Sequence, residues 1–163
     1  MRGEPPPDVT ADAEELLRPC GCFVTLKTRG NLRGCLGNFV SDKPLCQLVS
    51  EMARSSALDD PRFAKNRVRP EELDDVDIEI SVLSPLEKIE DPMRIELGKH
   101  GIYIKRRRAR GCFLPQVATE QGWTKEEFLS FCCSHKAGLP ADAWKDPATE
   151  VHVFTAEIVR ERE

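Results

Sequence analysis

A thiol and a guanidinium stand close together in residues 32–37, which read Leu-Arg-Gly-Cys-Leu-Gly. In a strand, alternation places the side chains of Arg33 and Cys35 on one face, together with position Gly37. A guanidinium beside a thiol favours the thiolate, which is the nucleophilic form of cysteine. Glycines such as Gly34 and Gly37 let a ligand or another backbone approach closely. The segment therefore predicts Cys35 as a catalytic nucleophile, with Arg33, Gly34 and Gly37 as ligand-binding positions.

The same segment also has a purely structural interpretation. Buried cysteines are common packing residues, and glycines relieve crowding within a sheet. The three histidines of the chain all lie far from Cys35 in the sequence, so no neighbouring base is evident. The sequence leaves nucleophile and packing residue as open alternatives for Cys35.

A second candidate for chemistry is the carboxylate of Glu79. Residues 76–82 alternate between apolar and polar side chains, which is the clearest strand pattern in the sequence. Glu79 shares its face with further polar groups, and on an exposed sheet face these are ordinary solvated positions. If the face is covered, the carboxylates need partners such as Arg33 or Arg62. On the second alternative Glu79 is predicted as catalytic, and Ser81 and Arg62 as ligand-binding.

Gln116 and Glu120 complete the predicted ligand-binding set, because they lie one helical turn apart and can line a pocket over that strand. Residues 59–63, Asp-Asp-Pro-Arg-Phe, end a helix, so Asp60 is expected to accept backbone or arginine hydrogen bonds. Five cations within residues 105–110 mark a hairpin tip. Such a tip is more often a solvated turn than a binding site, so we leave it outside the predicted site.

The length and composition indicate one soluble domain. A chain of 163 residues can bury one sizeable core but not two ordinary independent ones. A net charge of -4 gives no bulk attraction to nucleic acid or to an anionic membrane, so neither is an expected partner. No apolar run approaches the roughly 18 residues of a membrane helix, and the N-terminus lacks the apolar core of a secretory signal. We therefore expect a cytoplasmic protein.

The cysteine pattern predicts free thiols and no metal or other cofactor. Seven is an odd number for a disulfide framework, and export is not indicated. Structural zinc usually needs two C-x-x-C-like pairs, whereas the chain has only Cys20-x-Cys22 and the adjacent Cys132 and Cys133. The spacing that holds a radical-generating iron–sulfur cluster is also missing.

The expected elements combine strands and helices in mixed order. The predicted strands and hairpins occupy residues 23–27 with 32–40, 76–82, 101–106 with 111–114, and 151–158. The predicted helices begin near Pro44 and at the capping box Thr124-x-x-Glu127, with shorter turns at 11–17 and 70–73. Without a regular βαβ alternation, this order favours an α+β domain with a largely antiparallel sheet built from hairpins and flanked by helices.

The blocks that carry chemistry also carry a family resemblance. The chain resembles the AMMECR-type domain family in six segments, residues 23–26, 32–37, 60–63, 78–84, 114–118 and 136–140, and at Trp123. The resemblance covers about Cys20 to Ile158. It divides the chain into a proline-rich segment, residues 1–19, and an AMMECR-type domain, residues 20–163. It implies an α+β fold with one antiparallel sheet and flanking helices.

The resemblance also implies partners. Members of this family occur alone or in a gene system with a Memo-like protein and a radical-SAM protein, so these are the expected partners. We expect either a component whose Cys/Arg/Glu pocket takes a small metabolite or nucleotide-like ligand, or a non-catalytic adaptor that holds a peptide or partner protein in the same groove.

Overall fold

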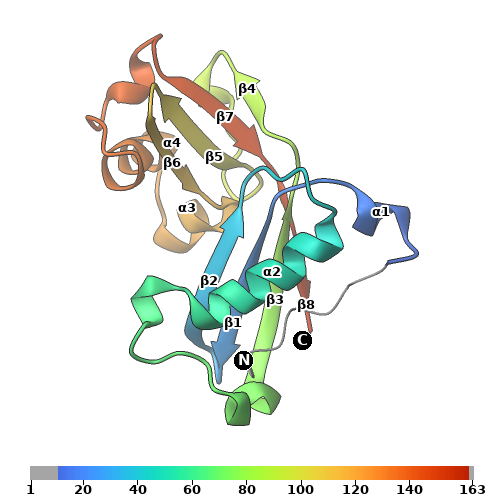
Figure 1. Ribbon diagram of the computed structural model, residues 1–163. Helices are drawn as coiled ribbons and strands as arrows, with labels where there is room; N and C mark the ends of the chain where they lie inside the picture. The colour runs from blue at the N-terminus through green and yellow to red at the C-terminus, as the bar shows by residue number, and fades with distance from the viewer. Residues whose placement is uncertain (1–10, 162–163) are drawn as a thin grey trace. The chain divides into compact units, whose positions relative to one another are not determined.

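The computed structural model describes residues 11–161, which form two compact units. The first unit contains residues 11–83 and 157–161, and the second spans Ser84–Ala156. Each unit contains one four-stranded antiparallel sheet (Figure 1), in the strand orders β2-β1-β3-β8 and β4-β7-β5-β6. The predicted α+β class is confirmed. The single sheet implied by the resemblance is wrong, since the chain builds two. The proline-rich residues 5–7 lie outside the described residues.

The described residues of the first unit form four strands, two α-helices and two 3-10 turns. Its elements are α1 (Glu14–Leu17), β1 (Cys22–Thr28), β2 (Asn31–Asn38), α2 (Leu45–Leu58), η1 (Pro61–Phe63), η2 (Pro70–Asp75), β3 (Val76–Leu83) and β8 (Ala156–Arg160). The expected hairpin is confirmed, because β1 and β2 are joined by Arg29 and Gly30 at φ of 50° and 78°. Two such left-handed residues form the tight turn that matches the twist of paired strands.

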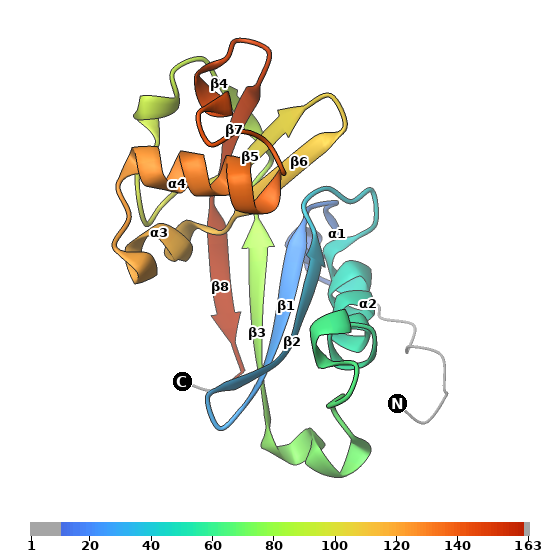
Figure 2. The ribbon, with the colours of Figure 1, turned by 90° about the vertical axis from the view of Figure 1, so that its left-hand side faces the viewer.

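Helix α2 covers one face of the first sheet, lying against β1 and β2 (Figure 2). Val24 and Leu26 of the sheet are buried in the same cluster as Ala57 of the helix. The approach is close at Gly34, where a Cβ atom would lie 1.9 Å from the carbonyl oxygen of Ser56. Gly34 is therefore needed for packing against the helix.

Ser56 binds the helix to both strands of the hairpin. Its hydroxyl accepts a hydrogen bond from the Leu36 N–H at 2.9 Å and donates one to the Val24 carbonyl at 2.8 Å. The side chain is fully buried, so water cannot replace these bonds. Loss of the hydroxyl would remove both of these buried hydrogen bonds.

The second unit places its helices on one face of its sheet. Its elements are β4 (Glu87–Ile89), η3 (Pro92–Arg94), β5 (Gly101–Arg106), β6 (Ala109–Phe113), α3 (Pro115–Gln121), α4 (Lys125–Phe131), the π-helical η4 (Cys132–Lys136), η5 (Ala143–Lys145) and β7 (Glu150–Phe154). Ile102 and Ile104 of the sheet are buried in one cluster with Phe128 and Leu129 of α4. The predicted capping box of Thr124 and Glu127 is confirmed.

The last predicted strand is wrong in one respect. Residues 151–158 do not form one strand, because Thr155 separates β7 from β8 and the two belong to different sheets. The Thr155 N–H donates to the Ser84 hydroxyl at 2.8 Å, and its carbonyl accepts from the Ser84 N–H at 2.9 Å. These bonds hold the break in the strand against Ser84.

None of the helices in the described part of the chain is both long and apolar enough to span a membrane. All seven cysteines, which lie within the described residues, are free thiols, as predicted.

We predict that Ser56→Ala lowers the free energy of unfolding by about 1–3 kcal/mol, because the buried Leu36 N–H and Val24 carbonyl lose their shared partner. Urea titration of the variant checks this value. Ser55→Ala, at the neighbouring and partly exposed helical position, is the matched control and should change stability by less than about 0.5 kcal/mol. Equal effects of the two substitutions would mean that the hydroxyl of Ser56 does not hold the strands.

Candidate functional site

Cys35 and Glu79 lie on the same face of the first sheet. Thr25, on the strand between them, is opposite Cys35 of β2 and opposite Glu79 of β3. Residues directly opposite each other in paired strands share a face. The neighbouring Val24 and Leu26 belong to the α2 side, so this row faces away from the helix. The shared face predicted for Cys35 and Glu79 is confirmed.

Arg33 does not share that face, and this prediction is wrong. Lys27 is opposite Leu32 whereas Leu26 is opposite Gly34, so Arg33 is the extra residue of a β-bulge. Because Lys27 is on the face of Thr25, both Leu32 and Cys35 are on that face too. Strict alternation is broken between them, and the Arg33 side chain turns to the helix side.

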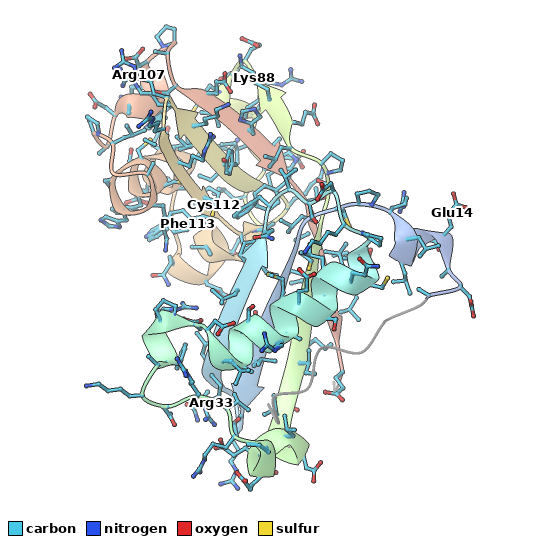
Figure 3. All side chains as sticks on the ribbon, in the orientation of Figure 1. Glu14, Arg33, Lys88, Arg107, Cys112 and Phe113 are labelled. Carbon is cyan, nitrogen blue, oxygen red and sulfur yellow. The ribbon has the colours of Figure 1, made fainter. Side chains whose placement is uncertain are left out.

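The guanidinium of Arg33 is bound to the segment that follows α2 (Figure 3). It donates to both carboxylate oxygens of Glu72, at 3.0 and 3.2 Å, and to the carbonyls of Asn66 and Arg67. Arg33 is only 8% exposed. The hydrogen bonds that Glu72 accepts from the Arg33 side chain and from the Arg69 N–H lower the pKa of Glu72 to about 2. Arg33 therefore anchors η2 against the sheet.

A pocket of about 410 Å³ lies beside this anchor. Its lining joins opposite charges and amides from the β1–β2 turn and from the segment after α2: Thr28, Arg29, Asn31, Arg33, Asn66, Glu72 and Asp75. Neither Cys35 nor Glu79 lines it. Contrary to the sequence prediction, Arg33 therefore does not accompany the Cys35 thiol. It lines a separate pocket in which two arginines face two carboxylates.

Asp60 and Arg62 bind the backbone of Cys35. Strand β2 is at the edge of its sheet, so the N–H and carbonyl of Cys35 that point away from β1 need other partners. Asp60 accepts from the Cys35 N–H at 3.0 Å, and Arg62 donates to the Cys35 carbonyl at 3.0 Å. The two side chains therefore bind this edge as a neighbouring strand would.

Asp60 and Arg62 also bind each other. Two hydrogen bonds of 3.0 and 2.7 Å join the guanidinium to the carboxylate. Asp60 is 2% exposed, whereas the side chain of Arg62 is 56% exposed. The bond from Arg62 is the main reason that the pKa of Asp60 falls to about 2, and further bonds come from the Cys35 and Arg62 N–H groups. The structural role predicted for Asp60 is confirmed.

Arg62 also acts on the thiol of Cys35. Its hydrogen bond to Asp60 is the main cause of its raised pKa, and smaller contributions come from the charge of Cys35 and a hydrogen bond to it. On the other strand, the Thr25 hydroxyl donates to the Cys35 sulfur at 3.2 Å. A guanidinium and a hydroxyl thus lie beside one partly exposed thiol.

Glu79 is paired with cations other than those predicted. Lys27 and Arg160 both contact its Oε2 atom, at 3.4 and 2.9 Å. The Glu79 side chain is 13% exposed, so the fully solvated alternative does not apply. The expected pairing with Arg33 or Arg62 is wrong, since those guanidinium groups are bound to Glu72 and Asp60. Glu79 of β3 therefore connects its strand to β1 and β8 through these two ion pairs.

The remaining predicted site residues divide between the two units. Gly37 and Ser81 are both opposite Phe23, on the face of Cys35. A Cβ at Gly37 would lie 2.5 Å from the ring of Phe23, so the glycine is needed for packing. Gln116 and Glu120 lie on α3 in the second unit. Their part in a common site stays a prediction.

Burial raises the pKa of five other thiols. Desolvation raises the pKa of Cys22 to about 12 and that of Cys112 to about 11. It also raises the pKa of Cys20, Cys132 and Cys133. Within residues 11–161, no group of three or more His, Cys, Asp or Glu side chains is arranged to hold a metal ion.

Sequence reasoning missed Thr25, Lys27 and Arg160. A two-residue turn at Arg29 and Gly30 predicts the pairing of β1 with β2, but without a bulge it would place Thr25 opposite Gly34. Only the extra residue brings Thr25 opposite Cys35. Arg160 comes from the far end of the chain, and no local pattern connects it with Glu79.

We predict that acid pH destabilises the first unit through Asp60. Its folded-state pKa of about 2 is below the ordinary value of 3.8. Its contribution is therefore complete above the ordinary pKa and is lost as the pH falls toward 2. Asp60→Asn should lower the free energy of unfolding near pH 7 by on the order of 1–3 kcal/mol, and by less near pH 2.5. Urea titration at both pH values measures the difference.

Two controls isolate this effect. Glu72 loses its stabilisation over the same pH range, so only the difference between the wild type and Asp60→Asn is informative. Asp59→Asn changes the charge of the exposed neighbour and should leave stability nearly unchanged. An Asp60→Asn cost that is the same at both pH values would contradict a role for the carboxylate charge.

The comparisons with known proteins agree with this fold. The AMMECR1 family model matches residues 1–159. A protein of Methanothermobacter thermautotrophicus is 50% identical over 147 residues, which cover 86% of this chain and 75% of that protein. An Aquifex aeolicus protein is 43% identical, covering 92% and 79%. The crystal structure of an uncharacterised Pyrococcus horikoshii protein is similar, with a TM-score of 0.84, 42% identity and coverage of 98% and 81%. This chain belongs to the AMMECR1 family.

Proposed function

We propose that the chain binds a small metabolite or nucleotide-like ligand at Cys35 and uses the thiolate of Cys35 as a nucleophile. The observation that carries this proposal is the contact of the Thr25 hydroxyl with the Cys35 sulfur, beside the Arg62 guanidinium. A hydrogen-bond donor and a cation at the same sulfur favour the charged form of the thiol. Partial exposure gives a reagent access to it.

The proposed step is a displacement. The thiol of Cys35 releases its proton to solvent, and the thiolate attacks an electrophilic carbon of the ligand. A sulfur–carbon bond forms while the leaving group departs with its bonding electrons. Thr25 and Arg62 stabilise the thiolate, while Asp60 holds Arg62 and the backbone of Cys35 in position. Glu79 belongs to this proposal as a positioning residue, because it fixes Lys27 and Arg160 on the same face.

The cellular part of the proposal follows from the family resemblance. We propose that the chain acts in the cytoplasm with Memo-like and radical-SAM proteins. The radical chemistry would belong to the partner, and the chain would supply ligand binding at Cys35 together with Gly37 and Ser81 on its face.

The adaptor is the second candidate, and the packing roles of Gly34 and Gly37 favour it. Both glycines sit where a Cβ would meet backbone or a ring, and Arg33 anchors η2. Much of the 32–37 segment therefore serves the fold. An adaptor predicts that no thiol stands out in reactivity and that partner binding survives the loss of the Cys35 sulfur.

We predict that iodoacetamide alkylates Cys35 faster than Cys20, Cys22, Cys112, Cys132 or Cys133, whose pKa values are raised by burial. Thr25→Val and Arg62→Gln should each slow Cys35 by roughly two- to tenfold, as expected for the loss of one hydrogen bond or one nearby charge. Site-resolved mass spectrometry on the folded protein gives the rates near neutral pH.

Thr28→Val is the matched control, because it removes a hydroxyl of the same strand that contacts Arg33 instead of the sulfur. It should leave the Cys35 rate unchanged. Should Cys35 react among the slowest thiols, at a rate that follows unfolding, it is a packing residue and the thiolate proposal is wrong. Retention of Memo-like partner binding by Cys35→Ser would then support the adaptor.

A further inference from the structure

We propose that the sheet face of the second unit opposite α3 and α4 binds single-stranded nucleic acid. The helices pack on the face that carries Ile102 and Ile104. Alternation along β5 therefore puts Tyr103 and Lys105 on the other face. A four-stranded antiparallel sheet with helices on one side and aromatic side chains on the other is an arrangement that recognises single strands.

The strand register shows which side chains share this face. Tyr103 is opposite Cys112 of β6 and His152 of β7, and His152 is opposite Lys88 of β4. One row thus carries Lys88, His152, Tyr103 and Cys112 across all four strands. The next row carries Glu150, Lys105 and Arg110. Residues from distant parts of the sequence form one surface.

Cations predominate on this surface. Lys88, Lys105 and Arg110 outnumber the single carboxylate of Glu150 in the two rows. The exposed Arg107 and Arg108 extend the charge at the adjoining turn (Figure 3 labels Arg107). The net charge of -4 predicts no such partner, but it averages over the whole chain. A local excess of cations is what attracts a phosphate backbone.

Aromatic rings lie among these cations. Tyr103 and His152 meet edge to face with ring centroids 6.0 Å apart, and Arg110 donates to the Tyr103 hydroxyl at 3.3 Å. Burial is the main cause of the lowered pKa of His152, whose side chain is 16% exposed. Bases stack on such rings whatever their identity, while the cations meet the phosphates. Acidic peptides and anionic lipids lack bases, so the rings favour nucleic acid.

The test measures binding of a fluorescein-labelled oligouridine of about 12 nucleotides by anisotropy, in the full chain and at several salt concentrations. We expect affinity to fall with salt, and Lys105→Gln and Arg110→Gln each to reduce the slope of log K against log salt by about 0.7. Tyr103→Leu should weaken binding about five- to tenfold through lost stacking. Tyr103→Phe keeps the ring and should bind nearly as the wild type does.

Lys99→Gln is the matched control, since it removes the same charge from an exposed Lys–Glu pair outside the two rows. It should leave the salt slope unchanged. Circular dichroism verifies that each variant is folded. Absence of binding at about 50 mM salt would overturn the proposal. Equal affinity for duplex RNA, for polyphosphate or for anionic vesicles, with no effect of Tyr103→Leu, would also overturn it, because attraction would then depend on charge alone.

Discussion

The Asp60–Arg62 pair is the interaction on which the first unit's candidate site depends. It binds the exposed edge of β2 at the N–H and carbonyl of Cys35. An unpaired sheet edge is otherwise open to pairing with another chain. The same guanidinium that completes the edge also acts on the Cys35 thiol. One ion pair therefore connects the stability of the strand with the chemistry available to Cys35.

The bulge at Arg33 is the second constraint. It turns the Arg33 side chain to the helix side, where the guanidinium holds η2 through Glu72. It also shifts the register so that Thr25 meets the Cys35 sulfur. Gly34, next to the bulge, lets Ser56 of α2 reach the hairpin backbone. The bulge in β2 thus affects both the packing of α2 on the hairpin and the surroundings of the Cys35 thiol.

Local patterns predicted most elements because their causes are local. The turn at Arg29 and Gly30, the alternation of β3 and the capping box at Thr124 all act within a few residues. The break at Thr155 was missed because apolar alternation continues on both sides of it, while the bonds that cause it come from Ser84. Alternation along each strand predicted the shared face of Cys35 and Glu79, but it did not predict their cationic partners. Those partners depend on a bulge and on contacts distant in sequence.

Asp60 and Arg62 occupy the hydrogen-bonding groups of Cys35 at the edge of β2. Amide hydrogen exchange of the folded protein, followed residue by residue by NMR, tests it most directly. The Cys35 N–H should be protected from exchange although it points away from β1, and Asp60→Asn should reduce that protection more than the protection of the Leu26 N–H on β1. Exchange of the wild-type Cys35 N–H at the rate of an unprotected edge amide would contradict the account.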